Sequence, residues 1–204
     1  MKPDQPIVYV LDDDERVREA LSSLLSSLSF RVEVFASAAE YLAFEKPDCP
    51  ACLILDLDLP GMSGLELQQK IAADEAPPII FVTGHGDVPS SVRAMKAGAI
   101  EFLLKPFDSQ ELLKSIDAAI VQDREARIER AHLAELQRRY SLLTPRERGV
   151  LPFVVAGLLN KQTAAELGTS EITIQVHRGQ IMREMAASSL ADLVKMAGKL
   201  GISC

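Results

Sequence analysis

The sequence predicts an α/β fold, with a five-stranded, parallel, doubly wound sheet joined by a long helix to a small all-α module. Short apolar runs of strand length recur in the first 107 residues, and each precedes a stretch of helical length with an amphipathic pattern. After residue 144 the pattern changes to short helices separated by glycines. These observations predict one sheet domain and one helical domain within 204 residues.

Four of the predicted strands end in polar side chains. Runs 7–11, 53–55, 79–82 and 102–104 are followed by Asp12 and Asp13, Asp56, Thr83 and Lys105. Because a ligand site lies just outside the carboxyl ends of parallel strands, we expect three carboxylates, a hydroxyl and an ammonium group to converge there.

Helices are expected between and after these strands. Residues 14–28 place Val17, Leu21, Leu24 and Leu28 on one face. The later helices are expected at residues 38–43, 64–72 and 89–97, with a fifth that starts at a capping box in residues 108–111.

The fifth helix has no obvious stop, because residues 112–140 contain neither glycine nor proline. We expect a first domain at residues 1–120, a helical linker at 121–140 and a second domain at 141–204. The alternating charges of the linker fit a solvated face. An alternative is pairing with a second copy through Ile116, Ile120, Ile128 and Leu136.

The second domain begins at a strong helix start, in which Thr144 is the N-cap, Pro145 the first helical residue and Glu147 the third. Gly149 and Pro152 lie inside this first helix, where we expect a kink. A short turn around Gly168 and Thr169 is typical of a helix-turn-helix. The expected helices are residues 145–156, 160–167, 170–185 and 189–199.

Charge is distributed unevenly. Residues 1–120 carry a net charge of −10, residues 121–140 of +1 and residues 141–204 of +2. The second domain is mildly basic and could therefore bind nucleic-acid phosphates, although the whole chain is acidic. No membrane-length apolar run or signal sequence is evident, so we expect a cytoplasmic protein with reduced thiols.

Cys49 and Cys52 have the spacing of a redox pair or half a zinc site. The two cysteines directly precede a predicted strand. A reactive thiol is instead favoured at a helix N-terminus, which lowers its pKa. We therefore expect both cysteines to be buried and structural.

The polar cluster suggests phosphoryl chemistry. Asp56 is the expected nucleophile, since a carboxylate can attack phosphorus and form an acyl phosphate. Mg²⁺, or Mn²⁺ in its place, would relieve the repulsion among the carboxylates. Asp13 and Asp56 would be direct ligands and Asp12 a ligand through water. Lys105 would supply positive charge to the phosphoryl oxygens and Thr83 a hydroxyl donor.

With these motifs, residues 5–120 resemble a bacterial response-regulator receiver domain of flavodoxin-like fold, and residues 141–200 resemble a LuxR-type DNA-binding module. Together they are similar to the FixJ/NarL family of two-component transcription regulators. Residues 82–89 and 95–99 are nearest to the FixJ branch.

The resemblance implies roles for individual receiver residues. Asp56 would take phosphate from a sensor histidine kinase, the backbone carbonyl of Asp58 would complete the metal shell, and Lys105-Pro106 would be a cis peptide. Thr83 and Phe102 would form a switch pair. A face around Val92, Lys96 and Glu101 would form a homodimer after phosphorylation.

In the second domain the resemblance makes residues 170–185 the recognition helix of promoter DNA, with RNA polymerase as a further partner. Base contacts are expected from Gln175, Val176 and Gly179. Phosphate contacts are expected from Lys161, Thr173, Arg178 and Arg183.

Two alternatives stay open. Asp56 and Asp58 also form the D-x-D of aspartyl-phosphate phosphohydrolases. The second alternative is a protein-interaction module that has lost DNA binding, for which the motive is Gly149, Pro152 and the small positive charge.

Overall fold

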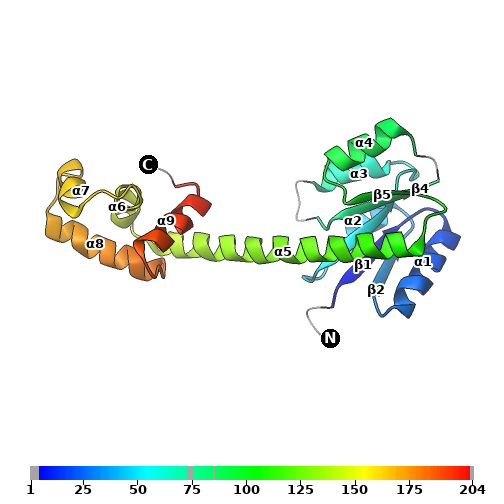
Figure 1. Cartoon of the computed structure of the whole chain (residues 1–204), viewed down its shortest axis with the longest axis horizontal. Helices are drawn as coiled ribbons and strands as arrows, with labels where there is room; N and C mark the ends of the chain where they lie inside the picture. The colour runs from blue at the N-terminus through cyan, green and yellow to red at the C-terminus, as the bar shows by residue number, and fades with distance from the viewer. Residues whose placement is uncertain (1–4, 73–75, 85, 203–204) are drawn as a thin grey trace. The chain divides into compact units, whose positions relative to one another are not determined.

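The computed structural model in Figure 1 describes residues 5–72, 76–84 and 86–202. The chain divides into two compact units, Met1–Arg127 and Ile128–Cys204. His85, within the 82–89 segment of the family resemblance, lies outside the described residues. Among the residues described, no helix is long and apolar enough to cross a membrane.

The first unit is built on a five-stranded parallel sheet, as predicted, in the order β2-β1-β3-β4-β5. The strands are β1 (Ile7–Leu11), β2 (Arg31–Phe35), β3 (Ala51–Asp56), β4 (Ile79–Thr83) and β5 (Glu101–Leu104). In this order the winding reverses between β1 and β3, which places the crevice of a doubly wound sheet at their carboxyl ends.

Helices cover both faces of the sheet (Figure 1). They are α1 (Glu15–Ser27), α2 (Ala38–Ala43), α3 (Gly64–Ile71), α4 (Val88–Lys96) and the start of α5 (Ser109–Leu142). One apolar cluster joins the sheet to α2, α3 and α4 through Tyr41, Leu67 and Ala94. The other joins it to α1 and α5 through Leu25 and Ile116. Every residue of β1, β3 and β4 is consequently buried, as in sheets covered on both faces.

The helix starts follow local capping. Asp87 accepts a hydrogen bond from the backbone N–H of Ser90 (2.7 Å), so α4 begins at Val88, one residue before the predicted start. The prediction that Leu28 lies on the buried face of α1 is wrong. Leu28 caps the helix and is 48% exposed, whereas Leu25 is fully buried.

The predicted long helix is confirmed as α5, which spans 34 residues. The sequence left open that this helix pairs with a second copy through four apolar residues. For three of the four this alternative is wrong. Ile116 and Ile120 are buried in the core of the first unit, and Leu136 is buried in the second unit. Only Ile128, 65% exposed, presents an apolar side chain to solvent among the four.

The part of α5 that ends the first unit is anchored to the amino end of β3. The carboxylate of Asp123, 1% exposed, accepts hydrogen bonds from the backbone N–H of Ala51 (2.9 Å) and from Arg127 Nε (2.7 Å). Arg127 also pairs with Asp48. A buried carboxylate with two donors holds this turn of helix in one register against the sheet.

Cys49 and Cys52 are free and buried, as expected. Cys49 packs in the apolar cluster on one face of the sheet and Cys52 in the cluster on the other. Burial raises the pKa of both thiols, which disfavours the thiolate that redox and zinc chemistry need.

The second unit contains the end of α5 and four further helices. These are α6 (Pro145–Val155), α7 (Asn160–Glu166), α8 (Glu171–Glu184) and α9 (Leu190–Lys199). The capping box of Thr144 and Glu147 is present at the start of α6. That helix continues through Gly149 and Pro152, and its Val150, Leu151 and Val154 side chains are buried in the core of the unit.

Candidate functional site

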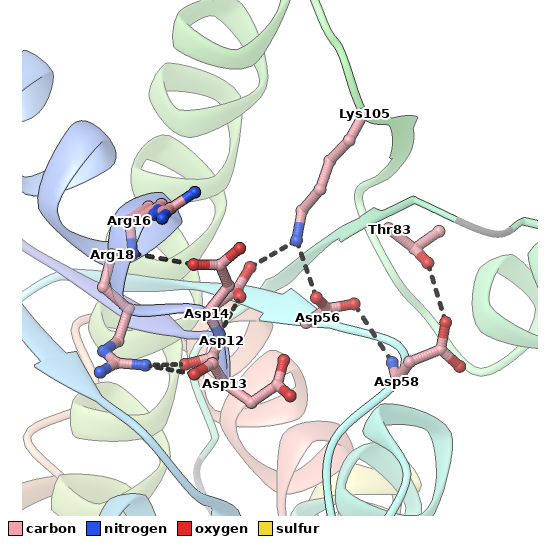
Figure 2. A network of polar contacts seen from close by, with 9 residues as sticks. All are labelled: Asp12, Asp13, Asp14, Arg16, Arg18, Asp56, Asp58, Thr83 and Lys105. Atoms are coloured by element: carbon pink, nitrogen blue, oxygen red, sulfur yellow. Dashed lines mark hydrogen bonds and ion pairs between the residues drawn. The ribbon is translucent and has the colours of Figure 1, made fainter.

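The carboxylates predicted at the strand ends lie together (Figure 2). Asp12 and Asp13 follow β1, and Asp56 is the last residue of β3. One ligand oxygen from each of the three lies within 4.8 Å of the others. Asp12 is fully buried and Asp56 is 6% exposed, whereas Asp13 is exposed to solvent. Three hard oxygen donors at one open crevice match what Mg²⁺ prefers.

Lys105, which follows β5, reaches into this cluster from the other side. Its Nζ lies 2.6 Å from Asp12 Oδ2 and 2.7 Å from Asp56 Oδ2. Burial opposes its charge, yet these two carboxylates raise the pKa of Lys105 above its ordinary value. Burial also raises the pKa of Asp12, against the effect of the lysine. The ammonium group thus keeps two crowded carboxylates compatible with the fold.

The loop that presents the carboxylates after β1 is held by contacts that sequence reasoning missed. Arg18 Nη1 donates to the backbone carbonyls of Asp12 (2.7 Å) and Asp13 (2.9 Å). Asp12 Oδ1 accepts the N–H of Asp14 (2.9 Å). Arg18 lies about one helical turn after the acidic pair, and this spacing was the signal in the sequence that could have predicted these contacts.

A second missed residue is Gly64, at the first position of α3. A Cβ on this residue would lie 2.4 Å from the backbone oxygen of Asp56, so only glycine permits the approach. Glycine is a poor helix former, and its place directly after the N-cap Ser63 was the signal for a close contact.

Thr83, the last residue of β4, is fully buried at the same edge. Its hydroxyl donates to Asp58 Oδ2 at 3.4 Å, and the Asp58 N–H donates to Asp56 Oδ1 at 3.1 Å (Figure 2). The side chain of Asp58 therefore faces Thr83 in this structure.

Phe102 lies on β5, with its ring centroid 6.0 Å from that of Phe81. The loop after β4 lies directly against it, since a Cβ on Gly86 would come within 2.9 Å of Phe102 Cε1. The ring of Phe102 therefore packs closely against this loop.

The helix-turn-helix of the second unit is formed by α7 and α8, joined through Gly168 at φ +60°. The residues predicted to contact DNA are mostly exposed: Lys161 on α7, and Thr173, Gln175, Val176, Gly179 and Arg183 on α8. Arg178 differs, because it is only partly exposed. Its Nη1 donates to Leu158 O (3.2 Å) and Asn160 Oδ1 (3.0 Å).

Residues 8–117, which contain the acidic crevice, match the family described as response regulator receiver domain. The chain belongs to this family. Residues 141–197 match the family described as bacterial regulatory proteins, luxR family, so the receiver is joined to a LuxR-type DNA-binding domain.

Several relatives match this chain over nearly its whole length, and so across both domains. Nodulation protein W of Bradyrhizobium diazoefficiens is 48% identical over 97% of this chain and 87% of its own length. Response regulator protein TodT of Pseudomonas putida is 47% identical over 95% of this chain and 86% of its own. The transcriptional regulatory protein FixJ of Bradyrhizobium diazoefficiens is 40% identical over 96% of each chain.

Two full-length solved structures are similar as well. The response regulator StyR superimposes with a TM-score of 0.82 at 47% identity, covering 96% of this chain and 99% of that one. FixJ from B. japonicum superimposes with a TM-score of 0.56 at 38% identity, covering 98% and 100%. The chain is thus a transcriptional response regulator of a two-component system.

This membership decides against one of the two interpretations that the sequence left open. The phosphohydrolase interpretation rested on Asp56 and Asp58, but the chain belongs to a receiver family, and the Asp58 carboxylate is bonded to Thr83. The interaction-module interpretation rested on Gly149, Pro152 and the small positive charge; α6 contains both residues within a domain that matches the LuxR family, and measurement of DNA binding tests the interpretation. The cis peptide expected at Lys105-Pro106 is present.

Proposed function

We propose that Asp56 is the phosphoacceptor of this response regulator and that its phosphorylation by a sensor histidine kinase controls dimerisation and promoter binding. One observation carries the proposal: Lys105 Nζ lies between the carboxylates of Asp12 and Asp56, with Asp13 beside them at the open edge. This is a crevice in which a phosphoryl group would meet a nucleophile and a cation together.

The carboxylates of Asp12, Asp13 and Asp56 and the backbone carbonyl of Asp58 would hold Mg²⁺ or Mn²⁺. All are oxygen donors, and three of them are already grouped. When bound, the metal neutralises negative charge as the phosphoryl group approaches three carboxylates.

The protein's own groups carry out the transfer. A carboxylate oxygen of Asp56 attacks phosphorus, the bond from phosphorus to the kinase histidine nitrogen breaks, and an acyl phosphate forms. Lys105 lies 2.7 Å from Asp56 Oδ2, within reach of the incoming phosphoryl oxygens. The receiver thereby catalyses its own phosphorylation by positioning and charge, without acting on an outside substrate.

The Thr83 hydroxyl and the Phe102 ring form the switch. A phosphoryl oxygen on Asp56 is a stronger acceptor for Thr83 than Asp58 at 3.4 Å, and it draws the hydroxyl inward. Inward movement after β4 opens space for Phe102, against which Gly86 lies. The phosphate shifts the receiver between two states because only one state offers it this contact.

The dimer face lies on α4 and β5, around Val92, Lys96 and Glu101. Val92 is 44% exposed, and Val88, Met95 and Leu104 add apolar side chains that are 75%, 44% and 54% exposed. An exposed apolar group with charged neighbours is typical of a protein-binding surface. It adjoins the switch, since Phe102 and Leu104 belong to the same strand.

Sedimentation velocity tests this proposal on the full chain. Acetyl phosphate with Mg²⁺ should convert wild type from monomer to dimer, while Val92→Asp should accept phosphate and stay monomeric, because a charge replaces an apolar contact. Val121→Asp, an exposed residue on α5, is the matched control and should still dimerise. Phosphorylated wild type that remains monomeric at concentrations that bind DNA would contradict the proposal.

In the DNA-binding domain, Lys161, Thr173 and Arg183 are the proposed phosphate contacts, and Gln175, Val176 and Gly179 face bases. Arg178 is proposed to position the interface instead of contacting phosphate. Its guanidinium ties α8 to the residues that begin α7, which carries Lys161.

Arg178→Ala and Lys161→Ala should therefore weaken DNA binding in different ways. Lys161→Ala should reduce the slope of log affinity against log salt by about 0.9, the value for one phosphate. Arg178→Ala should lower affinity at every salt concentration with the slope unchanged. Asn160→Ala, which removes an acceptor of Arg178 and no charge, should reproduce that result. If the salt slope falls in Arg178→Ala but is unchanged in Asn160→Ala, Arg178 contacts a phosphate directly and the positioning role is wrong.

A further inference from the structure

The recognition helix α8 has two faces with different chemistry. Ile174 and Ile181, with the C-cap residue Met185, are fully buried in the core of the DNA-binding domain, and they fix the rotation of the helix about its axis. The opposite face is a continuous exposed stripe at helical spacing, made of Ile172, Gln175, Val176, Gly179 and Arg183.

The stripe is short of hydrogen-bonding groups. Ile172 is 74% exposed and Val176 is 59% exposed, and they are one helical turn apart. Gly179, one turn further, has no side chain. Gln175 is the one residue between 172 and 179 on this stripe that can bond the edge of a base.

Folding does not explain the two apolar side chains. A branched side chain at an exposed helical position lowers helix propensity, and neither residue belongs to the apolar core of the domain. Both lie on the helix that enters DNA in the proposed function, so what faces them there is the floor of the major groove. The apolar group that the major groove displays is the 5-methyl group of thymine.

We propose that Ile172 and Val176 read thymine methyl groups, so that the chain selects A·T pairs at two neighbouring positions in each half-site. Four residues of helix span about 6 Å, and successive base pairs are about 3.4 Å apart. The two thymines therefore lie within about two base steps of each other. This inference rests on the proposed function of α8 in DNA binding.

Uracil tests the inference, because it keeps every hydrogen-bonding group of thymine and lacks only the methyl group. Duplexes are selected from a random pool on the full chain treated with acetyl phosphate and Mg²⁺, and the selected half-site is then synthesised with deoxyuridine for thymidine. Selected half-sites should share two neighbouring thymines. Each methyl removed should weaken wild-type binding about fourfold, the worth of one buried methylene-sized group.

Substitutions at Ile172 and Val176 test whether these two residues cause the sensitivity to the thymine methyl groups. Ile172→Ala should bind the thymine duplex about fourfold more weakly and lose its sensitivity to one of the two substitutions. The double variant Ile172→Ala, Val176→Ala should lose both. Helix formation is not at risk, since alanine is the better helix former. Val121→Ala, which changes an apolar residue that is 52% exposed and lies outside this domain, should keep the full sensitivity of wild type.

Three results would overturn the inference. They are selected half-sites without thymine, equal affinity of wild type for both duplexes, and a double variant that still distinguishes them. Failure of the full chain to retain any duplex in a salt-dependent manner would instead overturn the proposed function of α8, and the inference with it.

Discussion

Asp56→Asn is expected to abolish labelling of the chain by acetyl phosphate in the presence of Mg²⁺. An amide oxygen is neither a competent nucleophile toward phosphorus nor an anionic metal ligand, so both proposed tasks of Asp56 are lost in one substitution. Its backbone and volume are nearly conserved, and the contact of Gly64 with its carbonyl oxygen is retained. Labelling is followed by intact mass and should fall at least a hundredfold.

Asp58→Asn is the matched control, since it changes the neighbouring exposed carboxylate by the same isosteric step. It should retain labelling, because its backbone carbonyl is unchanged and its side chain is not the acceptor. It also weakens the acceptor of the Thr83 hydroxyl. Undiminished labelling of Asp56→Asn, or loss in Asp58→Asn alone, would place the phosphoacceptor elsewhere in the chain.

Lys105→Met is expected to change two properties in opposite directions. Without the ammonium group, Asp12 Oδ2 and Asp56 Oδ2 lose their partner, and Mg²⁺ no longer meets a fixed positive charge. The affinity for Mg²⁺ should rise at least tenfold, since two unit charges 4 Å apart interact by about 4 kcal/mol at an effective dielectric constant of 20. Labelling at saturating Mg²⁺ should become slower, because the phosphoryl oxygens lose a cation.

In the absence of metal, the same variant should be less stable, by about 3 kcal/mol or more, because a buried carboxylate is left without its cation. Isothermal titration with Mg²⁺ and urea unfolding with and without the metal measure the two effects. Lys114→Met, which removes an exposed lysine from the same domain, should change neither. If Lys105→Met leaves both the metal affinity and the labelling rate unchanged, Lys105 has no part in the site.

The elements that the sequence predicted well are those in which one local rule decides. The residues of β1, and those of β3 and β4 up to their last residue, are apolar because both faces of the sheet are covered, and the polar residue at the end of each apolar run marks the crevice. The start of α6 follows in the same way from Thr144, Pro145 and Glu147. Each signal lies within a few consecutive residues.

Contacts between residues that are distant in the sequence could not be predicted from it. Periodicity alone did not show whether Ile116 and Leu136 face their own domain or a second copy. Arg178 has the sequence context of a phosphate contact, but its partners Leu158 and Asn160 lie about twenty residues earlier, and only the fold brings them together. The bond between Thr83 and Asp58 has the same origin, since it joins the ends of two strands.

The two faces of α8 share no residue, and this separation has an evolutionary consequence. Ile174, Ile181 and Met185 carry the packing, so substitutions on the exposed stripe alter recognition without disturbing the core. Gly179 is an example of a stripe residue that packing does not constrain. A Cβ there would meet nothing within 4 Å, and glycine inside a helix costs about 1 kcal/mol relative to alanine. Selection for stability would have replaced it. A lineage descended from this chain can therefore acquire a new operator by single mutations at 172, 175, 176 or 179, each close to neutral for folding, while the receiver and its kinase remain as they are.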